Sequence, residues 1–142
     1  MPATVSSVGE WFEAIQAGQV ELVRNHAAEY AISVNSDGET GLMIAAREGN
    51  VELVKILGFF ENGMVNSEGK TAIMIAAEAN KGDVCKRLVA YEVNTTYGDF
   101  QMTPLMLAAE HGSTSAVSNL LPYLKAKTDT RGRTALMYAA AA

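Results

Sequence analysis

One seven-residue motif recurs four times and constrains the fold of this chain more than any other feature. Each copy begins with threonine, has methionine at its fourth position and ends in an alanine pair. The threonines are Thr40, Thr71, Thr103 and Thr134, and the interval between successive copies changes by no more than one position. Self-similarity at a nearly constant period of roughly 20 to 50 residues indicates stacked copies of one small unit.

Each motif is followed by a second periodic stretch. In the unit that begins at Thr40, which is the second unit because a divergent one precedes it, apolar residues recur at three- and four-residue intervals. This spacing marks one face of a helix; the residues are Val51, Leu53, Val54, Ile56 and Leu57. Gly49 and Gly112 lie where a first helix would end in a left-handed residue, and Asn80 takes that place in the third unit. A turn pair precedes three of the motifs, at Asp37-Gly38, Glu68-Gly69 and Arg131-Gly132. Each unit therefore reads as turn, short helix, break and longer helix.

The four motif threonines stand at the start of the predicted short helices. A threonine hydroxyl at this position accepts a hydrogen bond from a backbone N–H that has no partner within the helix. The alanine pairs allow neighbouring helices to approach closely, because larger side chains would hold the stacked units apart.

These residues resemble the ankyrin repeat, whose signature is Asp-x-x-Gly-x-Thr-Pro-Leu-His-x-Ala-Ala-x-x-Gly at about 33 residues. The segment from Asp129 to Thr134 matches the opening of that signature, and Thr103-Pro104-Leu105 keeps its proline. The resemblance implies an all-α ankyrin-repeat solenoid of stacked helix-turn-helix units, joined by short turns or β-hairpin-like fingers.

The resemblance implies a single ankyrin-repeat domain over residues 1–142. Its expected parts are a capping repeat at 9–39, internal repeats at 40–70, 71–102 and 103–133, and a truncated final repeat at 134–142. In the capping repeat, Trp11 and Phe12 replace the motif leucine and methionine, and we expect them to pack as a cap rather than bind a ligand. The missing second helix of the last repeat favours a fragment of a longer array over an end covered by a partner.

The chain departs from the signature in two ways. Methionine replaces the signature histidine in every motif, at Met43, Met74, Met106 and Met137. We expect these side chains to pack between units rather than form a soft-metal strip. This variant is similar to some protist ankyrin arrays, including arrays joined to NIMA-related kinases. In the fourth unit Gln101 replaces the turn glycine and the spacing grows by one residue, which predicts a finger of different shape.

Composition and motifs argue against several functions. A net charge of −5 disfavours binding to nucleic acid, and no run of about 18 apolar residues predicts a membrane helix. Residues 1–9 do not look like a signal peptide, so a cytoplasmic location is expected. Cys85 aligns with core valines, while His26 and His111 lie in different units without metal-ligand partners. Without a catalytic or phosphate-binding motif, we expect no enzyme activity, no cofactor and no small-molecule substrate.

The resemblance implies a module that binds a protein partner on its concave face, within a larger scaffold or regulatory protein. A regulatory segment of a protein kinase and a structural spacer are the alternatives. The implied contact residues are mixed but acidic on balance in the second and third units and basic in the fifth; they are Asp37, Glu39, Arg47, Glu68, Lys70, Glu78, Tyr97, Phe100, Met102, Glu110, His111, Arg131 and Arg133. Phe100 is either an interaction hot spot or folded back onto its own finger, with Tyr97 beneath it.

Overall fold

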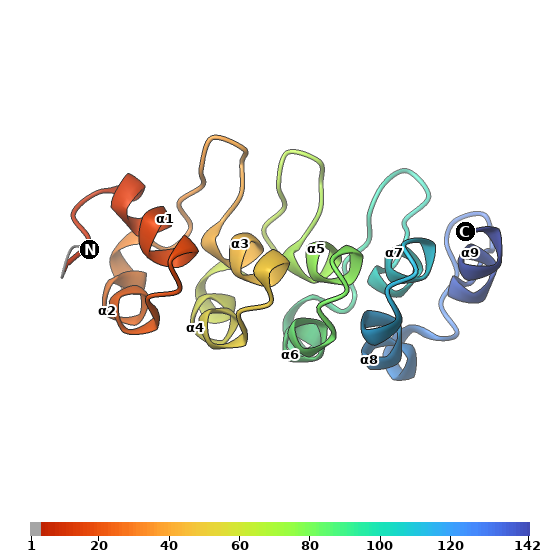
Figure 1. Cartoon of the computed structure of the whole chain (residues 1–142). Helices are drawn as coiled ribbons and strands as arrows, with labels where there is room; N and C mark the ends of the chain where they lie inside the picture. Colours follow the sequence, from red (N-terminus) through yellow and green to blue (C-terminus); the bar gives the residue numbers. More distant parts are fainter. Residues whose placement is uncertain (1–3) are drawn as a thin grey trace.

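A computed structural model describes residues 4–142, so the first three residues of the segment judged not to be a signal peptide lie outside it. Helices of two layers alternate along the chain, and the loops between successive pairs project from one side (Figure 1). The first layer contains α1 Val8–Gln16, α3 Gly41–Glu48, α5 Ala72–Glu78, α7 Pro104–Glu110 and α9 Ala135–Ala141. The second layer contains α2 Val20–Tyr30, α4 Val51–Glu61, α6 Gly82–Glu92 and α8 Thr114–Leu124.

The predicted all-α solenoid of stacked helix-turn-helix units is confirmed. Across residues 4–142 there is no named strand, and the one isolated β-bridge joins Tyr97 to Met102. The two helices of each of the first four units pack on one another, and within each layer successive helices pack side by side. The units therefore form one row, as a repeat that cannot bury its apolar face alone requires.

Three of the four motif threonines cap their helices as predicted. The hydroxyl groups of Thr40, Thr103 and Thr134 accept hydrogen bonds from the backbone N–H three residues later. The prediction is wrong for Thr71, whose side chain makes no cap bond to α5. Its hydroxyl lies 3.2 Å from that of Thr95 instead. A contact with a more distant residue of the same unit has therefore replaced the local cap bond.

The breaks after the short helices have the predicted geometry. Gly49 and Gly112 have φ angles of 79° and 65°, and Asn80 has 59°. Asparagine tolerates this left-handed region better than most residues because its short polar side chain bonds locally. Here the Asn80 side-chain oxygen also accepts the backbone N–H groups of Ser115 and Ala116, and thereby caps α8 of the next unit.

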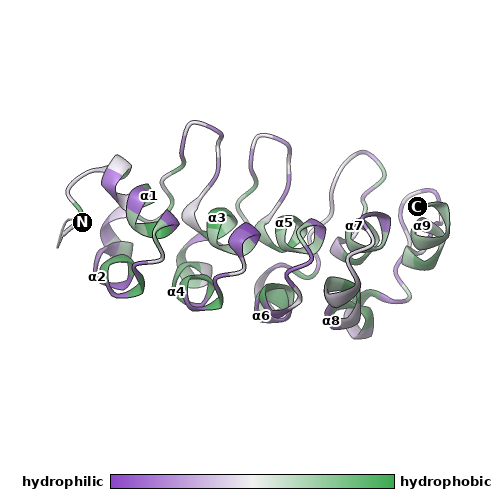
Figure 2. Ribbon diagram, in the orientation of Figure 1, coloured by the Kyte–Doolittle hydropathy of each residue, from purple (hydrophilic) through white to green (hydrophobic). Residues whose placement is uncertain are grey.

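The core lies between the two layers, where apolar faces of the helices meet (Figure 2). Met43, Met74 and Met106 are all at least 99% buried, so the prediction that they pack between units is confirmed for these three. Each contributes roughly 1.5–3 kcal/mol by leaving water. Met137 is 52% exposed because the described residues include no further helix layer beyond α9.

The first unit is a packed cap. Trp11 is fully buried and Phe12 is 8% exposed, as expected for residues that close the end of the core. The Trp11 ring stacks on Tyr30 with centroids 6.0 Å apart. These contacts confirm packing for both side chains.

Two buried glutamates tie successive units together. Glu61 accepts hydrogen bonds from the backbone N–H of Leu42 in its own unit and of Ile32 in the preceding one, both at 2.9 Å. Glu92 repeats the arrangement one unit later, with 2.8 Å bonds from Ile73 and Gly63. Burial raises the pKa of both carboxyl groups, and the backbone hydrogen bonds partly offset that rise.

Candidate functional site: the finger surface

The loops that project from the helix layers are hairpin-like fingers, each closed by backbone hydrogen bonds. The four fingers span residues 35–39, 66–70, 97–102 and 129–133. We define the finger surface as these fingers together with the ends of the first-layer helices beside them. It contains all the contact residues implied by the resemblance.

In three of the fingers, one polar side chain per finger holds the backbone in shape. The side-chain oxygen of Asn35 accepts the N–H groups of Asp37 and Glu39, both at 3.0 Å. Asn66 and Asp129 make the same pair of bonds in the second and fourth fingers. Side chains of this type mimic a backbone turn. These fingers are therefore rigid platforms for the residues at their tips.

The third finger is built differently, as the sequence predicted. Tyr97 takes the position of the turn-forming asparagine, and its backbone exchanges two hydrogen bonds with Met102, at 2.8 and 2.9 Å. Gln101 adopts a left-handed φ of 55°, where the other fingers have glycine. Such a conformation costs a residue with a Cβ about 1–2 kcal/mol. The extra residue and the strained turn direct Phe100 away from its own finger.

Neighbouring fingers contact one another. The Ser67 hydroxyl donates to the carbonyl of Asp37, and the ammonium of Lys70 lies 5.1 Å from the centre of the Tyr97 ring. The third and fourth fingers are joined by a 2.8 Å bond from the N–H of Thr130 to the carbonyl of Phe100. The row of fingers is therefore one connected surface.

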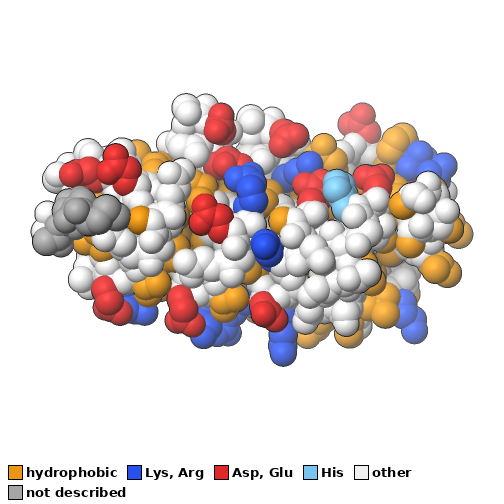
Figure 3. All heavy atoms as spheres, in the orientation of Figure 1, with side chains coloured by type: hydrophobic (Ala, Val, Ile, Leu, Met, Phe, Trp, Pro, Cys, Tyr) orange, Lys and Arg blue, Asp and Glu red, His pale blue; other side chains and the backbone are white. Residues whose placement is uncertain are grey.

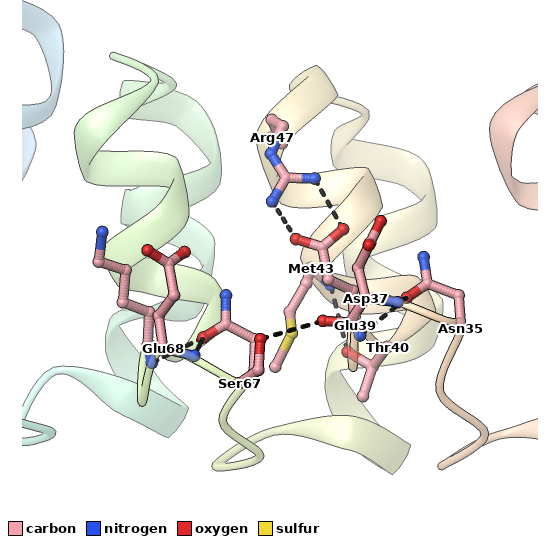
Figure 4. A network of polar contacts seen from close by, with 10 residues as sticks. Asn35, Asp37, Glu39, Thr40, Met43, Arg47, Ser67 and Glu68 are labelled. Carbon is pink, nitrogen blue, oxygen red and sulfur yellow. Dashed lines mark hydrogen bonds and ion pairs between the residues drawn. The ribbon is translucent and has the colours of Figure 1, made fainter.

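Arg47 on α3 is neutralised within the finger surface. Both of its terminal nitrogens donate to the carboxylate of Glu39, which lies almost buried at the base of the first finger (Figure 4). The hydrogen bond to Glu39 raises the pKa of Arg47. A bidentate pair of this kind fixes the guanidinium plane. Glu39 therefore acts by orienting Arg47, because it has little exposed surface of its own.

A second internal pair lies one unit further along. Lys70 donates to Glu78 at 2.9 Å, and Nε2 of His111 lies 3.6 Å from the same carboxylate oxygen. Burial acts to lower the pKa of Lys70, but the contact with Glu78 outweighs it and raises that pKa. His111 also donates from Nδ1 to the carbonyl of Leu107 at 2.9 Å, which satisfies the end of α7.

Because Arg47 and Lys70 are paired internally, the charged contact residues left without an ion pair from the first finger to the end of α7 are acidic. Asp37, Glu68 and Glu110 are exposed and make no ion pair within residues 4–142. A groove of about 760 Å³ lies between the first two fingers, lined by Asn35, Ser36, Asp37, Gly38, Glu39, Arg47, Asn66, Ser67 and Glu68. Figure 3 shows acidic side chains along this upper side of the molecule. The free charge in the central units is more acidic than the composition of the contact residues indicates.

The far end of the finger surface is apolar and basic. The guanidinium carbon of Arg131 lies 3.7 Å from the centre of the Phe100 ring, whose side chain stays 44% exposed. Arg131 also donates to Tyr138, and the Tyr138 hydroxyl donates to Asp129 at 2.6 Å. Burial by itself raises the pKa of Asp129, but the bonds from Tyr138, Arg133 and Arg131 together lower it to about 2. Arg131 is therefore locked in place.

The Phe100 ring lies against Arg131 of the following finger, and its role as a hot spot stays a prediction. It packs on the following finger and keeps nearly half of its surface exposed. Tyr97 and Met102 are half-buried beside it, whereas Arg133 is exposed. The proposed contact residues thus lie in one row, with Glu39, Lys70 and Glu78 mainly holding their neighbours.

The sequence analysis did not identify the asparagines that shape the first two fingers or the buried glutamates that join successive units. The step from Asn35 to Asn66 equals the step from Glu61 to Glu92, and both equal the interval between Thr40 and Thr71. A search for polar residues repeated at that interval would have found all four. These four residues lie outside the seven-residue motif, which consists mainly of apolar residues.

The remaining reactive groups lie apart from the finger surface. Cys85 is fully buried, and desolvation raises the pKa of its thiol to about 12, as expected for a core residue. No group of three or more His, Cys, Asp or Glu side chains in residues 4–142 could hold a metal ion. Over the same range, none of the helices is long and apolar enough to cross a bilayer.

The chain matches the family model for ankyrin repeats in three copies, over residues 11–99 and again over 80–142. No curated protein matches it. Members of the matched family are generally protein–protein interaction modules and are typically not enzymes. The matched residues extend over nearly all of the stacked units and fingers described above, and on this basis the chain belongs to the ankyrin-repeat family.

Proposed function

We propose that this chain is a protein-binding module that recognises its partner through the finger surface. The observation that carries the proposal is the preorganised row of fingers. Asn35, Asn66 and Asp129 fix the finger backbones, and contacts between neighbours hold the fingers together. A backbone that is already held in shape loses little conformational freedom when a partner binds, which favours affinity.

The charges of the surface indicate how a partner would be oriented. The free carboxylates of Asp37 and Glu68 would face basic groups, while Phe100 and Arg133 would face an apolar and acidic part. Complementary charge of this kind sets the register of a complex more than its affinity. The exposed ring of Phe100 is the best candidate for an energetic anchor, since a small number of side chains, often aromatic, carry most of the binding energy of an interface.

The experiment compares three forms of the protein as bait, with the proteins each retains measured quantitatively. The forms are the wild type, the double variant Phe100→Ala/Arg133→Ala, and the control Val8→Ala, which removes an apolar side chain that is equally exposed at 44%. Arg131 is left unchanged because its bonds to Asp129 and Tyr138 stabilise the fold.

We expect a partner retained by the wild type and the control to be lost by the double variant. With that partner purified, Phe100→Ala alone should weaken binding by about 2 kcal/mol, as truncation of a hot spot does. If every retained protein binds the double variant as tightly as the wild type, the finger surface is not the binding site. The regulatory kinase segment and the structural spacer stay predictions from the resemblance alone.

A further inference from the structure

The outward side of the second-layer helices carries three stripes of like residues. Because the units repeat at a nearly constant interval, equivalent side chains of successive helices lie beside one another. The three stripes are acidic at Glu21, Glu52 and Asp83, basic at Arg24, Lys55 and Lys86, and aromatic at Phe60, Tyr91 and Tyr123. Figure 3 shows acidic, basic and apolar side chains alternating along the lower edge, where these helices lie.

The acidic and basic stripes neutralise each other in the first two helices. Arg24 pairs with Glu21, and Lys55 lies 3.2 Å from Glu52. On α6 the neighbouring Arg87 is exposed and makes no ion pair within residues 4–142. A guanidinium without an ion-pair partner can bind a carboxylate in bidentate geometry.

We define the aromatic patch as the aromatic stripe together with Phe59 and Leu121, all of which are exposed. Phe59 is 72% exposed and packs edge-to-face on Phe60, with ring centres 5.2 Å apart. Exposures of the other members are 38% for Phe60, 47% for Tyr91, 41% for Leu121 and 55% for Tyr123. Single exposed apolar side chains are common, but several of them at equivalent positions of neighbouring helices favour an interaction site.

A groove between α4 and α6 joins the patch to the free cation. Its volume is about 310 Å³, and it is lined by Val54, Lys55, Arg87, Ala90 and Tyr91. The Tyr91 ring lies across Gly58, 3.4 Å from where a Cβ would stand on that residue. The absence of a side chain at Gly58 therefore lets the ring settle against α4. The only charged side chains that line the groove are basic.

We propose that this back surface, which is separate from the finger surface, docks an acidic and apolar segment of a partner protein. An apolar side chain of that segment fits the groove beside Tyr91, and a carboxylate pairs with Arg87. Tyrosine and arginine are the residue types in which binding energy concentrates. An anionic membrane fits less well, because its many head groups would also face the exposed Asp83, whereas one carboxylate of a segment can pair with Arg87 alone.

The test is selection from a random-sequence peptide display library. The library is bound to the wild type, to Phe59→Ser/Arg87→Glu, and to the matched control Leu136→Ser/Lys127→Glu. Both double variants change one exposed apolar side chain and one exposed cation, so neither should disturb the core. Circular dichroism during heating checks that all three proteins fold alike.

We expect peptides that pair aspartate or glutamate with aromatic or aliphatic residues. They should bind the wild type and the control at least about tenfold more tightly than Phe59→Ser/Arg87→Glu. Their binding should shift the NMR signals of α4 and α6 rather than those of the fingers. The loss of this binding in Phe59→Ser/Arg87→Glu would leave the proposed role of Phe100 untouched, so the two surfaces are tested separately.

Four results would overturn the proposal. The first is that no peptide is enriched, and the second is that the enriched peptides bind all three proteins equally. The third is that phosphatidylserine vesicles, rather than acidic peptides, bind the wild type and not the Phe59→Ser/Arg87→Glu variant. The fourth is that the wild type forms dimers that this variant does not, which would assign the surface to a second copy of the chain.

Discussion

The central units and the fourth unit are copies of one motif, yet they are held together differently. In the central units, residues 32–92, a buried glutamate near the end of each second-layer helix bonds the backbone of two units. In the fourth unit Leu124 takes that position and is equally buried. The difference shows that one fold can join its units either by polar bonds or by apolar packing.

The residue that faces each glutamate changes with it. Ile32 and Gly63, which donate to Glu61 and Glu92, have left-handed φ angles of 69° and 82°. Asn94, the equivalent residue opposite Leu124, does not adopt a left-handed φ. The glutamate and the left-handed residue before it therefore form a matched pair, and the fourth unit lacks both partners.

Replacing Glu92 by leucine should have the largest effect on stability, because it puts the residue of the fourth unit at a position where two backbone N–H groups need a carboxylate. Glu92→Leu leaves the N–H groups of Gly63 and Ile73 without their partner. Each unsatisfied group costs about 1–3 kcal/mol, so we expect about 3 kcal/mol less free energy of unfolding in urea titrations. The exposed Glu52→Leu is the control and should change stability by less than about 0.5 kcal/mol. A loss below about 1 kcal/mol for Glu92→Leu would show that the two ways of joining units are interchangeable.

The junction between the central units and the fourth unit depends on Gly82, the first residue of α6. A Cβ there would overlap Ser115 Oγ and lie 2.6 Å from Asn119 Nδ2 and 2.8 Å from the Ser115 carbonyl. Gly82→Ala should therefore cost about 2 kcal/mol through overpacking, seen as a lower melting temperature.

The helical glycine Gly9 provides the matched control for Gly82. A Cβ on Gly9 would meet only Ser7 Oγ, at 3.8 Å. We expect Gly9→Ala to stabilise the protein by about 0.5–1 kcal/mol, since alanine favours the helix. Equal effects of the two alanine substitutions would mean that α6 and α8 can separate without cost.

A smaller gain in stability is expected from replacing Ile32 by glycine, the residue that stands at the equivalent position 63. Isoleucine is strained at the φ of 69° that Ile32 adopts, whereas Gly63 meets the same requirement without a Cβ. Ile32→Gly relieves about 1–2 kcal/mol of strain and loses about 0.5–1 kcal/mol of chain entropy. We expect a net gain of less than about 1 kcal/mol in urea unfolding. The reverse exchange, Gly63→Ile, should destabilise the protein, and a loss in both variants would argue against strain at Ile32.

The smallest expected effect is a difference between the central units and the fourth unit in how their stability changes with pH. The pKa values of Glu61 and Glu92 are raised by folding. The stability that this shift contributes to the folded state is complete below pH 4.5 and is lost as pH rises through the folded-state pKa values. Asp129, whose pKa is lowered from 3.8 to about 2, stabilises the fold above 3.8 and loses this contribution as pH falls toward 2.

Hydrogen exchange at several pH values measures this difference. Between pH 7 and 4.5, amides of α3 to α6 should gain protection, once the intrinsic exchange rate is corrected for. Between pH 4 and 2, α9 should lose protection first, because Tyr138 is held through Asp129. Uniform change over the whole chain would contradict the division, and Asp129→Asn should remove the acid sensitivity of α9.

The sequence by itself determined the stacked helical units, because each depends on contacts within a few residues. The threonine caps, the left-handed residues at Gly49 and Asn80 and the apolar periodicity are all local. It also indicated a changed third finger, from the missing glycine at Gln101. Repetition of these local signals at a constant period is what made the fold readable.

Only the tertiary structure decided which side chains are free to act. Arg47 and Lys70 look like available cations in the sequence, but Glu39 and Glu78 neutralise them. Phe100 meets Arg131, which lies one full repeat further along the chain, and no local pattern reports that contact. The physical reason is that a charge or a ring is available only if its neighbours in space leave it so. Those neighbours stand eight residues away for Arg47 and Lys70, and a full repeat away for Phe100.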